Sequence, residues 1–125
     1  MKISVVIPTY NRKHTLARAI NSIFSQTRQV FEIIVVDDGS TDGTPEWIMQ
    51  TYPAVKYIYQ KNSGVSSARN TAIRSAKGNW IALLDSDDEW LPSKLEKQIE
   101  FLMKQPDYKF CHTNEIWIRN GRRVN

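Results

Sequence analysis

The chain has 125 residues, of which 41% are hydrophobic and 24% are charged. This composition is typical of a globular protein and excludes a disordered or fibrous chain. The length is enough for one domain, which we expect to span residues 1–125. The formal net charge is +4, and the basic residues form no stripe interleaved with aromatic side chains. A nucleic acid is therefore not expected as a partner.

The sequence shows no pattern for export or for membrane insertion. Met1 leads directly into an apolar segment without a small-residue cleavage site, and no apolar run approaches the roughly 20 residues that span a bilayer. We therefore expect a cytoplasmic protein and leave its oligomeric state open. The closing Arg119, Arg122 and Arg123 suit a peripheral contact with anionic lipid at the cytoplasmic face of a membrane. Cys111, the single cysteine, lies in an apolar run and is expected to be buried.

Short apolar runs alternate with amphipathic segments, which is typical of parallel strands joined by crossover helices. The runs that predict strands are residues 3–7 (ISVVI), 31–36 (FEIIVV), 55–59 (VKYIY) and 80–84 (WIALL). The third run alternates and is expected near an edge of the sheet, whereas the other runs are mainly apolar and are expected to be buried. Residues 109–113 and 115–119 predict further strands, and Asn120 and Gly121 predict a hairpin turn after the second of them.

Amphipathic segments predict a helix after each of the first four strands. Asn11 is expected to cap the first helix and Thr44 the second. The third should cover residues 65–77 and end at Gly78 in the left-handed conformation, and Pro92 opens the last. The apolar side chains expected to face the sheet are Leu16, Ile20, Ile23 and Phe24 in the first helix, Val65, Ala68, Ala72 and Ala76 in the third, and Leu95, Ile99 and Leu102 in the last.

The aspartates gather in two turns, each directly after a predicted strand. Apart from Asp107, they are Asp37, Asp38 and Asp42 after the second strand, and Asp85, Asp87 and Asp88 after the fourth. In an open parallel sheet the strand-to-helix turns share the carboxyl edge, where ligands bind. Both turns should therefore converge with Thr9, Tyr10 and Asn11 into one site. Asp42 is expected to stabilise its own turn rather than to contact a ligand.

Carboxylates gathered at one edge repel each other and are stabilised by a divalent cation such as Mg²⁺ or Mn²⁺. An ion of this kind, held by one or two carboxylates, completes its shell with water and substrate phosphate, which indicates a pyrophosphate-containing ligand. The chain contains neither G-x-G-x-x-G nor G-x-x-x-x-G-K-[ST]. Because these glycine-rich phosphate cradles are missing, the metal is expected to bind the phosphates.

Four segments together resemble the successive signatures of glycosyltransferase family 2. They are VVIPTYNR (residues 5–12), VVDDGSTDGT (35–44), NSGVSSARN (62–70) and LLDSDDEW (83–90). Each segment alone is a weak signal, but four in this order over residues 5–90 make the match specific. The resemblance implies an α/β fold of the Rossmann-like GT-A kind, a mainly parallel sheet flanked by helices. It also implies an enzyme that transfers a sugar, with inversion, from a nucleotide sugar to an acceptor.

The resemblance implies roles for individual residues at the nucleotide. Thr9 and Tyr10 match residues that line the base and ribose pocket. Asp38 matches the carboxylate that accepts a hydrogen bond from the base, usually uracil, and Arg69 matches a residue beside the base and phosphates. We therefore expect a UDP-sugar as the donor.

The acidic motif of the family supplies one carboxylate to the ribose and another to the metal. Two registers fit this sequence, Asp85-x-Asp87 and Asp87-Asp88, and we keep both. Asp85 and Asp87 are accordingly candidates for contact with the donor. Asp87 and Asp88 are candidates for binding Mn²⁺ or Mg²⁺.

The catalytic base is not assigned. The family takes this base and most acceptor contacts from a segment downstream of the metal motif, and neither Asp107 nor Glu115 is convincingly placed for the task. We expect the chain to stop before that segment of a longer enzyme, whose acceptor is a saccharide or a lipid-linked molecule. One alternative is a module that binds a nucleotide sugar without chemistry. Another is a phosphotransferase of the haloacid-dehalogenase type, although there the D-x-D motif follows the first strand.

Overall fold

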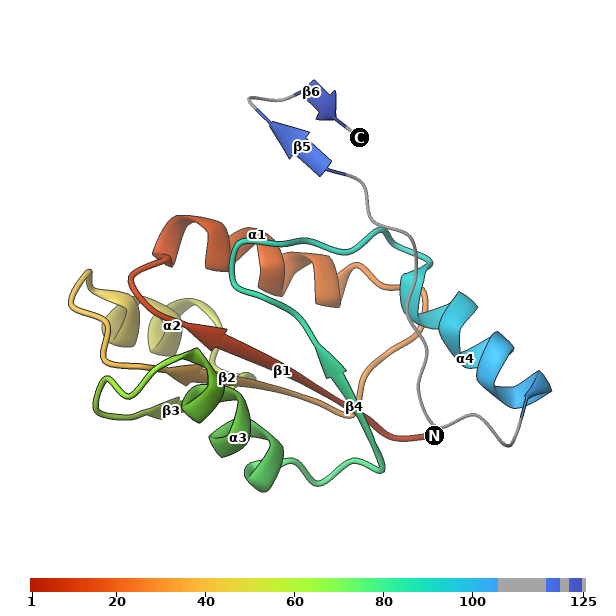
Figure 1. The fold of residues 1–125 in the computed structure, drawn as a ribbon, viewed down its shortest axis with the longest axis horizontal. Helices are drawn as coiled ribbons and strands as arrows, with labels where there is room; N and C mark the ends of the chain where they lie inside the picture. The colour runs from red at the N-terminus through yellow and green to blue at the C-terminus, as the bar shows by residue number, and fades with distance from the viewer. Residues whose placement is uncertain (106–116, 120–121, 125) are drawn as a thin grey trace.

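A four-stranded parallel sheet forms the centre of the structure, a computed structural model that describes residues 1–105, 117–119 and 122–124 (Figure 1). Its strands are β1 (Ile3–Thr9), β2 (Glu32–Asp37), β3 (Lys56–Tyr59) and β4 (Trp80–Leu83). They lie in the order β3-β2-β1-β4, and every pairing is parallel. The chain therefore runs outward from β1 to β3 and then crosses to the other side of β1. Such a reversal of strand order opens a crevice at the carboxyl ends of the strands.

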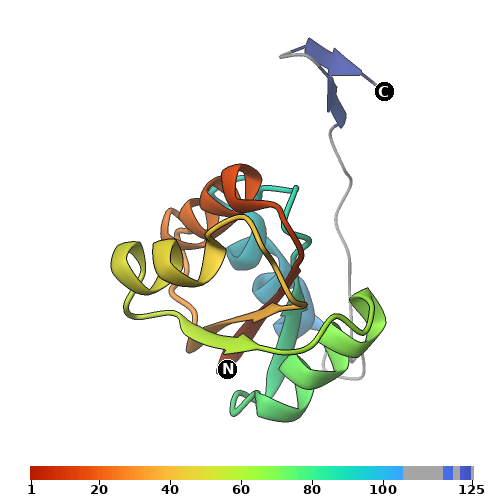
Figure 2. The ribbon, with the colours of Figure 1, turned by 90° about the vertical axis from the view of Figure 1, so that its left-hand side faces the viewer.

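The helices form a layer on each face of the sheet, as Figure 2 shows from the side. They are α1 (Lys13–Phe24), α2 (Thr44–Thr51), α3 (Val65–Ser75) and α4 (Lys94–Lys104). Helices α1, α2 and α4 pack on one face, where Leu16, Ile48 and Leu95 join the buried cluster that contains Val5 and Val35. Helix α3 covers the other face with Ala68 and Ala72. None of the helices in these described ranges is long and apolar enough to cross a membrane.

The predicted strands are confirmed, with boundaries that differ by at most two residues. Strand β1 is buried along its whole length, and β2 is buried from Ile33 onward. These central strands carry β-branched side chains on both faces, as expected for a parallel sheet covered by helices on both sides. Strand β3 lies at an edge, as its alternating pattern predicts.

Strand β4 differs from the prediction of a buried strand. Within the described ranges it pairs only with β1, and Ile81 and Leu83 are 39% and 56% exposed. Both residues stand opposite Ser4 and Val6 in the register with β1. An apolar strand pattern cannot distinguish an edge strand from a central strand, because it shows how apolar a run is and not how many neighbours it has.

Two predicted helix caps are wrong. The residue that precedes α1 is Arg12, whose side chain makes no capping hydrogen bond, and the Lys13 N–H at the start of the helix donates to Asp42. The Asn11 side chain instead accepts a hydrogen bond from the Thr41 N–H at 2.8 Å. Thr44 lies inside the first turn of α2, after Gly43. Its N–H and hydroxyl both donate to Asp42, so Asp42 stabilises its own turn, as predicted.

Gly78 does not end α3. The helix stops at Ser75 with Ala76 in an extended conformation, and Gly78 is not among the glycines with positive φ. The glycine is needed for close packing instead, because a Cβ at this position would lie 2.6 Å from Ser4 Oγ and 2.7 Å from the Lys2 carbonyl oxygen. Its own N–H donates to Ser4 Oγ.

Most of the predicted core side chains are buried, with two exceptions. Phe24 is the last residue of α1, lies outside its buried face and is 57% exposed. Its ring stacks on Tyr52 at a ring-centroid distance of 6.2 Å. Val65 begins α3 and is also exposed. In α4, Leu95 and Leu102 are buried and Ile99 is partly buried, as predicted.

The last described residues form an antiparallel hairpin of β5 (Trp117–Arg119) and β6 (Arg122–Val124). Trp117 pairs with Val124 and Arg119 with Arg122, which is the pairing that the predicted turn requires. The predicted strand at 109–113, the predicted burial of Cys111, and Asp107 and Glu115 lie outside the described residues.

Candidate functional site

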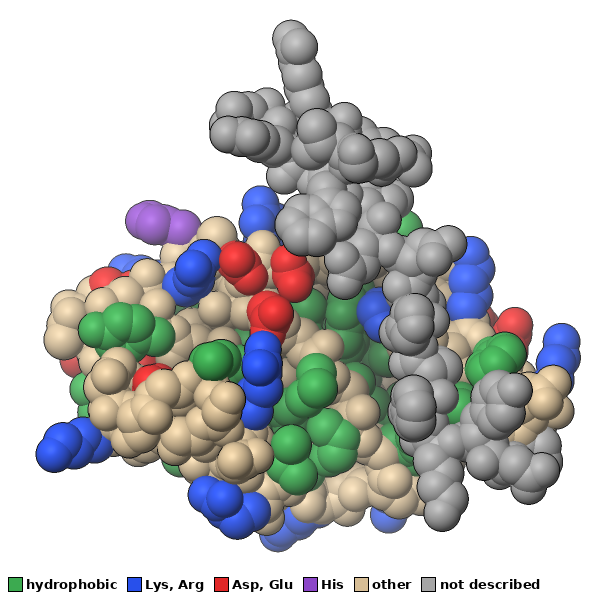
Figure 3. Space-filling view, viewed as in Figure 1, with side chains coloured by type: hydrophobic (Ala, Val, Ile, Leu, Met, Phe, Trp, Pro, Cys, Tyr) green, Lys and Arg blue, Asp and Glu red, His purple; other side chains and the backbone are tan. Residues whose placement is uncertain are grey.

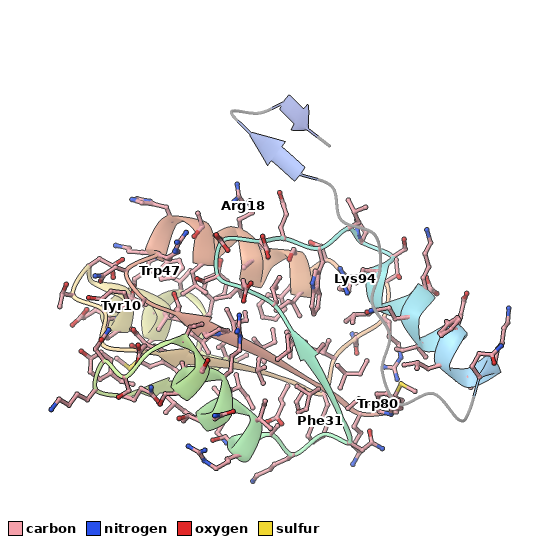
Figure 4. All side chains as sticks on the ribbon, in the orientation of Figure 1. Tyr10, Arg18, Phe31, Trp47, Trp80 and Lys94 are labelled. Atoms are coloured by element: carbon pink, nitrogen blue, oxygen red, sulfur yellow. The ribbon has the colours of Figure 1, made fainter. Side chains whose placement is uncertain are left out.

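A cavity with a volume of about 410 Å³ opens at the carboxyl ends of β1, β2 and β4. Its wall includes most of the residues predicted to contact a donor, namely Thr9, Tyr10, Asp38, Arg69, Asp85 and Asp87. Figure 4 shows Tyr10 at this end of the sheet and Phe31 and Trp80 at the opposite end. The convergence that the parallel-sheet rule predicts is therefore present in the fold.

The turn after β1 is held in an unusual backbone conformation. Asn11 has a φ of 50° and is the single non-glycine residue with positive φ among the described residues. Such a conformation costs free energy and persists only where the surrounding structure holds it. Here the Asn11 N–H donates to Ser40 Oγ and the Asn11 side chain accepts from the Thr41 N–H, both at 2.8 Å. Asn11 therefore ties the β1 turn to the β2 turn and is not part of the cavity wall itself.

Thr9 lies at the cavity and carries a buried hydroxyl. The residue is 3% exposed, and its Oγ1 is the single buried side-chain oxygen or nitrogen without a hydrogen-bond partner in the part of the chain that the structure describes. Buried polar atoms are nearly always paired, so an unpaired one needs an explanation. Thr9 lines the cavity, but the hydroxyl itself is enclosed by the protein, so a ligand in the cavity would not reach it in this conformation.

Asp38 holds the loop that precedes α3. The carboxylate is 4% exposed and accepts hydrogen bonds from Gln60 Nε2, the Ser63 N–H and the Gly64 N–H, each at 2.8 Å. Burial acts to raise the pKa of Asp38, but these hydrogen bonds favour the charged form and lower the pKa below its ordinary value. A carboxylate can accept about four hydrogen bonds, so Asp38 retains capacity for one donor from a ligand.

The acidic residues after β4 form a compact cluster. Oxygen atoms of Asp85, Asp87 and Asp88 lie within 4.8 Å of one another, and the turn is closed by a hydrogen bond from the Asp88 N–H to the Asp85 carbonyl. The donor set is made of exposed carboxylates, which is the chemistry that Mg²⁺ and Mn²⁺ prefer. These residues therefore fit a divalent cation of this kind.

Arginines surround the cluster from two helices. Arg69 of α3 pairs with Asp85 at 2.8 Å, and Arg12 pairs with Asp87 at 3.2 Å. Arg18 of α1 donates to the Asp87 carbonyl at 3.2 Å and lies 3.8 Å from the Glu89 carboxylate. Figure 3 shows acidic and basic side chains side by side on this face of the molecule.

Sequence reasoning missed several residues of the site. Arg12 lines the cavity, and the only signal for it was its place directly after the predicted β1 turn. Gln60 and Asn62 support Asp38, since Gln60 donates to the carboxylate and the Asn62 side chain donates to the Asp38 carbonyl. Asp37, in contrast, belongs to a turn that was expected at the site, but it is fully buried and accepts hydrogen bonds from the Ser40 N–H and the Tyr57 hydroxyl. It therefore supports the fold and does not face the cavity.

Residues 4–121 match the family described as Glycosyl transferase family 2. The chain belongs to this family. One curated relative is the Escherichia coli protein named UDP-Glc:alpha-D-GlcNAc-diphosphoundecaprenol beta-1,3-glucosyltransferase WfgD. It is 37% identical over 124 residues, which cover 98% of this chain and 49% of WfgD. The chain spans 16% to 49% of the length of the curated relatives that it matches.

Solved structures of other proteins share the fold. TarS 1-349 from S. aureus in complex with UDP-GlcNAc superposes with a TM-score of 0.73 and 32% identity, over 83% of this chain and 32% of that chain. The mannosyltransferase PcManGT from Pyrobaculum calidifontis in complex with GDP-Man and Mn²⁺ gives a TM-score of 0.69 and 29% identity, over 81% of this chain and 32% of that chain. The predicted GT-A fold is confirmed, and the phosphotransferase alternative gains no support.

Proposed function

We propose that this chain binds a nucleotide sugar together with Mn²⁺ or Mg²⁺ and forms the donor-binding part of a glycosyltransferase. The observation that carries the proposal is the position of the carboxylate cluster of Asp85, Asp87 and Asp88 at the mouth of a cavity. The wall of that cavity also includes Asp38 and Tyr10. A phosphate-bearing ligand with a hydrogen-bonding base matches both ends of such a site.

The residues divide between the two ends of the ligand. Asp38, an acceptor, suits a base that presents an N–H donor, and Tyr10 is exposed beside it with a ring that can lie against the base. Asp87 and Asp88 would hold the metal ion, and Asp85 would contact the ribose. Arg69 lines the same cavity and would contact the phosphates.

A bound divalent cation would neutralise the charge that develops on the departing nucleoside diphosphate. The chain's own residues contribute position: the β4 turn fixes the carboxylates, and Asp38 fixes the loop before α3 through its hydrogen bonds. Transfer with inversion to a saccharide or lipid-linked acceptor is part of the proposal. The name of WfgD includes a diphosphoundecaprenol, which supports a lipid-linked acceptor.

A UDP-sugar is the proposed donor. The names of WfgD and of the TarS complex contain UDP-Glc and UDP-GlcNAc, whereas PcManGT binds GDP-Man. Both uracil and guanine carry an N–H that an acceptor such as Asp38 can bind, so Asp38 alone does not choose between them. We favour uracil because two of these three proteins have a uridine nucleotide in their names.

Thermal unfolding with UDP, GDP and ADP, each with and without Mn²⁺, tests the proposal. We expect UDP with Mn²⁺ to raise the melting temperature most, since a ligand at 100 times its dissociation constant adds about 2.7 kcal/mol of stability. The Asp38→Asn variant should lose most of this shift and Arg74→Gln, on the exposed face of α3, should keep it. A larger shift with GDP would change only the proposed base, from uracil to guanine. The absence of a shift with every nucleotide would contradict the site itself.

A further inference from the structure

Arg12 and Asp87 form an ion pair that joins the two turns beside the cavity. Arg12 Nη1 donates to Asp87 Oδ2 at 3.2 Å, and the two side chains are 52% and 48% exposed. Arg12 follows the end of β1 and Asp87 follows the end of β4, so the pair spans the crevice where the strand order reverses. The Arg12 guanidinium is thus bound to a carboxylate that, in the proposed function, binds the metal ion.

The backbone before Arg12 directs it toward this position. Asn11 is held at a φ of 50° by hydrogen bonds with Ser40 and Thr41, and Arg12 is the residue that leads from this turn into α1. A residue held in a sparsely populated conformation by its surroundings often marks a functional constraint. Here the constraint fixes the point from which the Arg12 side chain extends to the β4 turn.

The ion pair and a metal ion compete for the same carboxylate. Asp87 Oδ2 cannot accept from Arg12 and coordinate a cation without rearrangement, and a positive charge beside the cluster repels a second one. The cavity beside the ion pair is lined by Arg69 and Asp38 as well as by Arg12 and Asp87, so a ligand with phosphate groups fits next to the pair. The Arg12 guanidinium lines the same cavity and can therefore turn from Asp87 to a ligand without leaving the site.

We propose that Arg12 is a resident counter-cation, which neutralises Asp87 before the metal binds and moves to a phosphate group when metal and nucleotide bind together. The inference rests on the proposed function and adds a mechanism of coupling to it. A planar guanidinium binds phosphate oxygens as well as carboxylates. A metal ion that binds alone breaks the ion pair between Arg12 and Asp87 and leaves Arg12 without a new partner. A metal ion that binds with a nucleoside diphosphate gives Arg12 a phosphate group as its new partner. Each ligand therefore strengthens the binding of the other by the same factor.

Binding of Mn²⁺ alone and of UDP at saturating Mn²⁺ tests this coupling in the Arg12→Gln variant. We expect Mn²⁺ alone, followed by the electron paramagnetic resonance of the free ion, to bind about fivefold more tightly, since a half-exposed ion pair and one repulsive charge are removed. We expect UDP, followed by calorimetry, to bind about tenfold more weakly, since a charge-assisted hydrogen bond is lost. These opposite signs are the signature of the proposal.

Two further variants separate this role from a structural one. Arg18→Gln removes a positive charge from α1, the helix that begins directly after Arg12. Arg18 contacts Glu89 and a backbone carbonyl rather than a carboxylate of the cluster. Its two affinities should stay within about twofold of the wild type. Arg12→Lys keeps the charge and loses the planar fork, so Mn²⁺ alone should bind as in the wild type while UDP binds more weakly.

The outcomes distinguish the inference from the function on which it rests. If the wild type binds UDP and Mn²⁺ but Arg12→Gln leaves both affinities unchanged, or weakens both, the counter-cation role is wrong and the proposed function stands. If Arg12→Gln does not fold, weakened Mn²⁺ binding by Arg12→Lys overturns the inference in the same way. If the wild type binds neither UDP nor Mn²⁺, both proposals are wrong.

Discussion

Replacing Asp38 by asparagine tests whether this carboxylate fixes the loop before α3. In the wild type it accepts hydrogen bonds from Gln60 Nε2 and from the N–H groups of Ser63 and Gly64. An asparagine can keep its oxygen toward Gln60 and Ser63, but its amide then faces the Gly64 N–H with a second donor. One hydrogen bond is lost and the other two lose their charged acceptor.

The expected cost is about 2 kcal/mol of unfolding free energy. A hydrogen bond to a charged group contributes about 1.5 to 3 kcal/mol, against about 1 kcal/mol for a neutral one. Gly64 is exposed, so water can satisfy part of the freed N–H and the cost stays near the lower end of the possible sum. Because Asp38 also lines the cavity, this experiment is carried out without ligand.

The cost should depend on pH in a defined direction. The pKa of Asp38 is lowered in the folded protein, so its contribution is fully present above the unfolded pKa of about 3.9. The contribution is lost as the pH falls from there through the folded pKa, because protonation removes the charged acceptor. Asparagine does not titrate. The stability gap between wild type and Asp38→Asn should therefore be constant between pH 7 and 5 and narrow below about pH 4.

Urea unfolding at pH 7, 5 and 3.5, with amide hydrogen exchange at pH 7, measures these effects. Exchange at Ser63 and Gly64 should become faster in Asp38→Asn. It should not change in Asp42→Asn, because the Asp42 carboxylate accepts from the N–H groups of Lys13 and Thr44 rather than from the loop before α3. A gap below about 0.5 kcal/mol at pH 7, the range of ordinary surface substitutions, would refute the reasoning. A gap that stays equally wide at pH 3.5 would refute the part played by charge.

Two further variants probe the metal cluster and the close packing of the sheet edge. Asp88→Asn should remove the Mn²⁺ dependence of UDP binding without lowering the melting temperature of the free protein, because one charge of a mutually repulsive cluster is gone; titration calorimetry that still shows Mn²⁺ dependence would count against this residue as a ligand. Gly78→Ala should lower the unfolding free energy by about 2 kcal/mol, since its Cβ would lie 2.6 Å from Ser4 Oγ. Urea unfolding that shows no loss would mean that the β1 start and the segment before β4 move apart freely.

The strands and the position of the site could be predicted because both depend on local patterns and one general rule. Apolar runs rich in β-branched residues predicted β1 and β2 within two residues of their bounds. The rule that parallel strands share a carboxyl edge then brought Asp38 and Asp85 together, although β1 separates β2 from β4 in the sheet. No knowledge of side-chain orientation was required for either step.

Caps and edges failed because they depend on neighbours that the local sequence does not name. Asn11 carries the side chain of a typical cap, yet its amide accepts from Thr41 of another turn, 30 positions along the chain. Gly78 has the position of a helix terminator, but the nearby backbone of Lys2 determines why a side chain is not tolerated there. In both cases a contact with a residue far away in the sequence determines the role of the side chain or of the glycine.

The pairing of Arg12 with Asp87 shows the same limit at the site itself. The two residues are 75 positions apart, and they meet because β4 lies beside β1 rather than beside β3. Sequence spacing predicts which carboxylates share a turn, since they are neighbours along the chain. It does not predict which cation lies against them, because that depends on the order of strands and on the conformation of Asn11. Any account of metal binding at this edge must therefore include the arginines that the fold brings to the acidic turn.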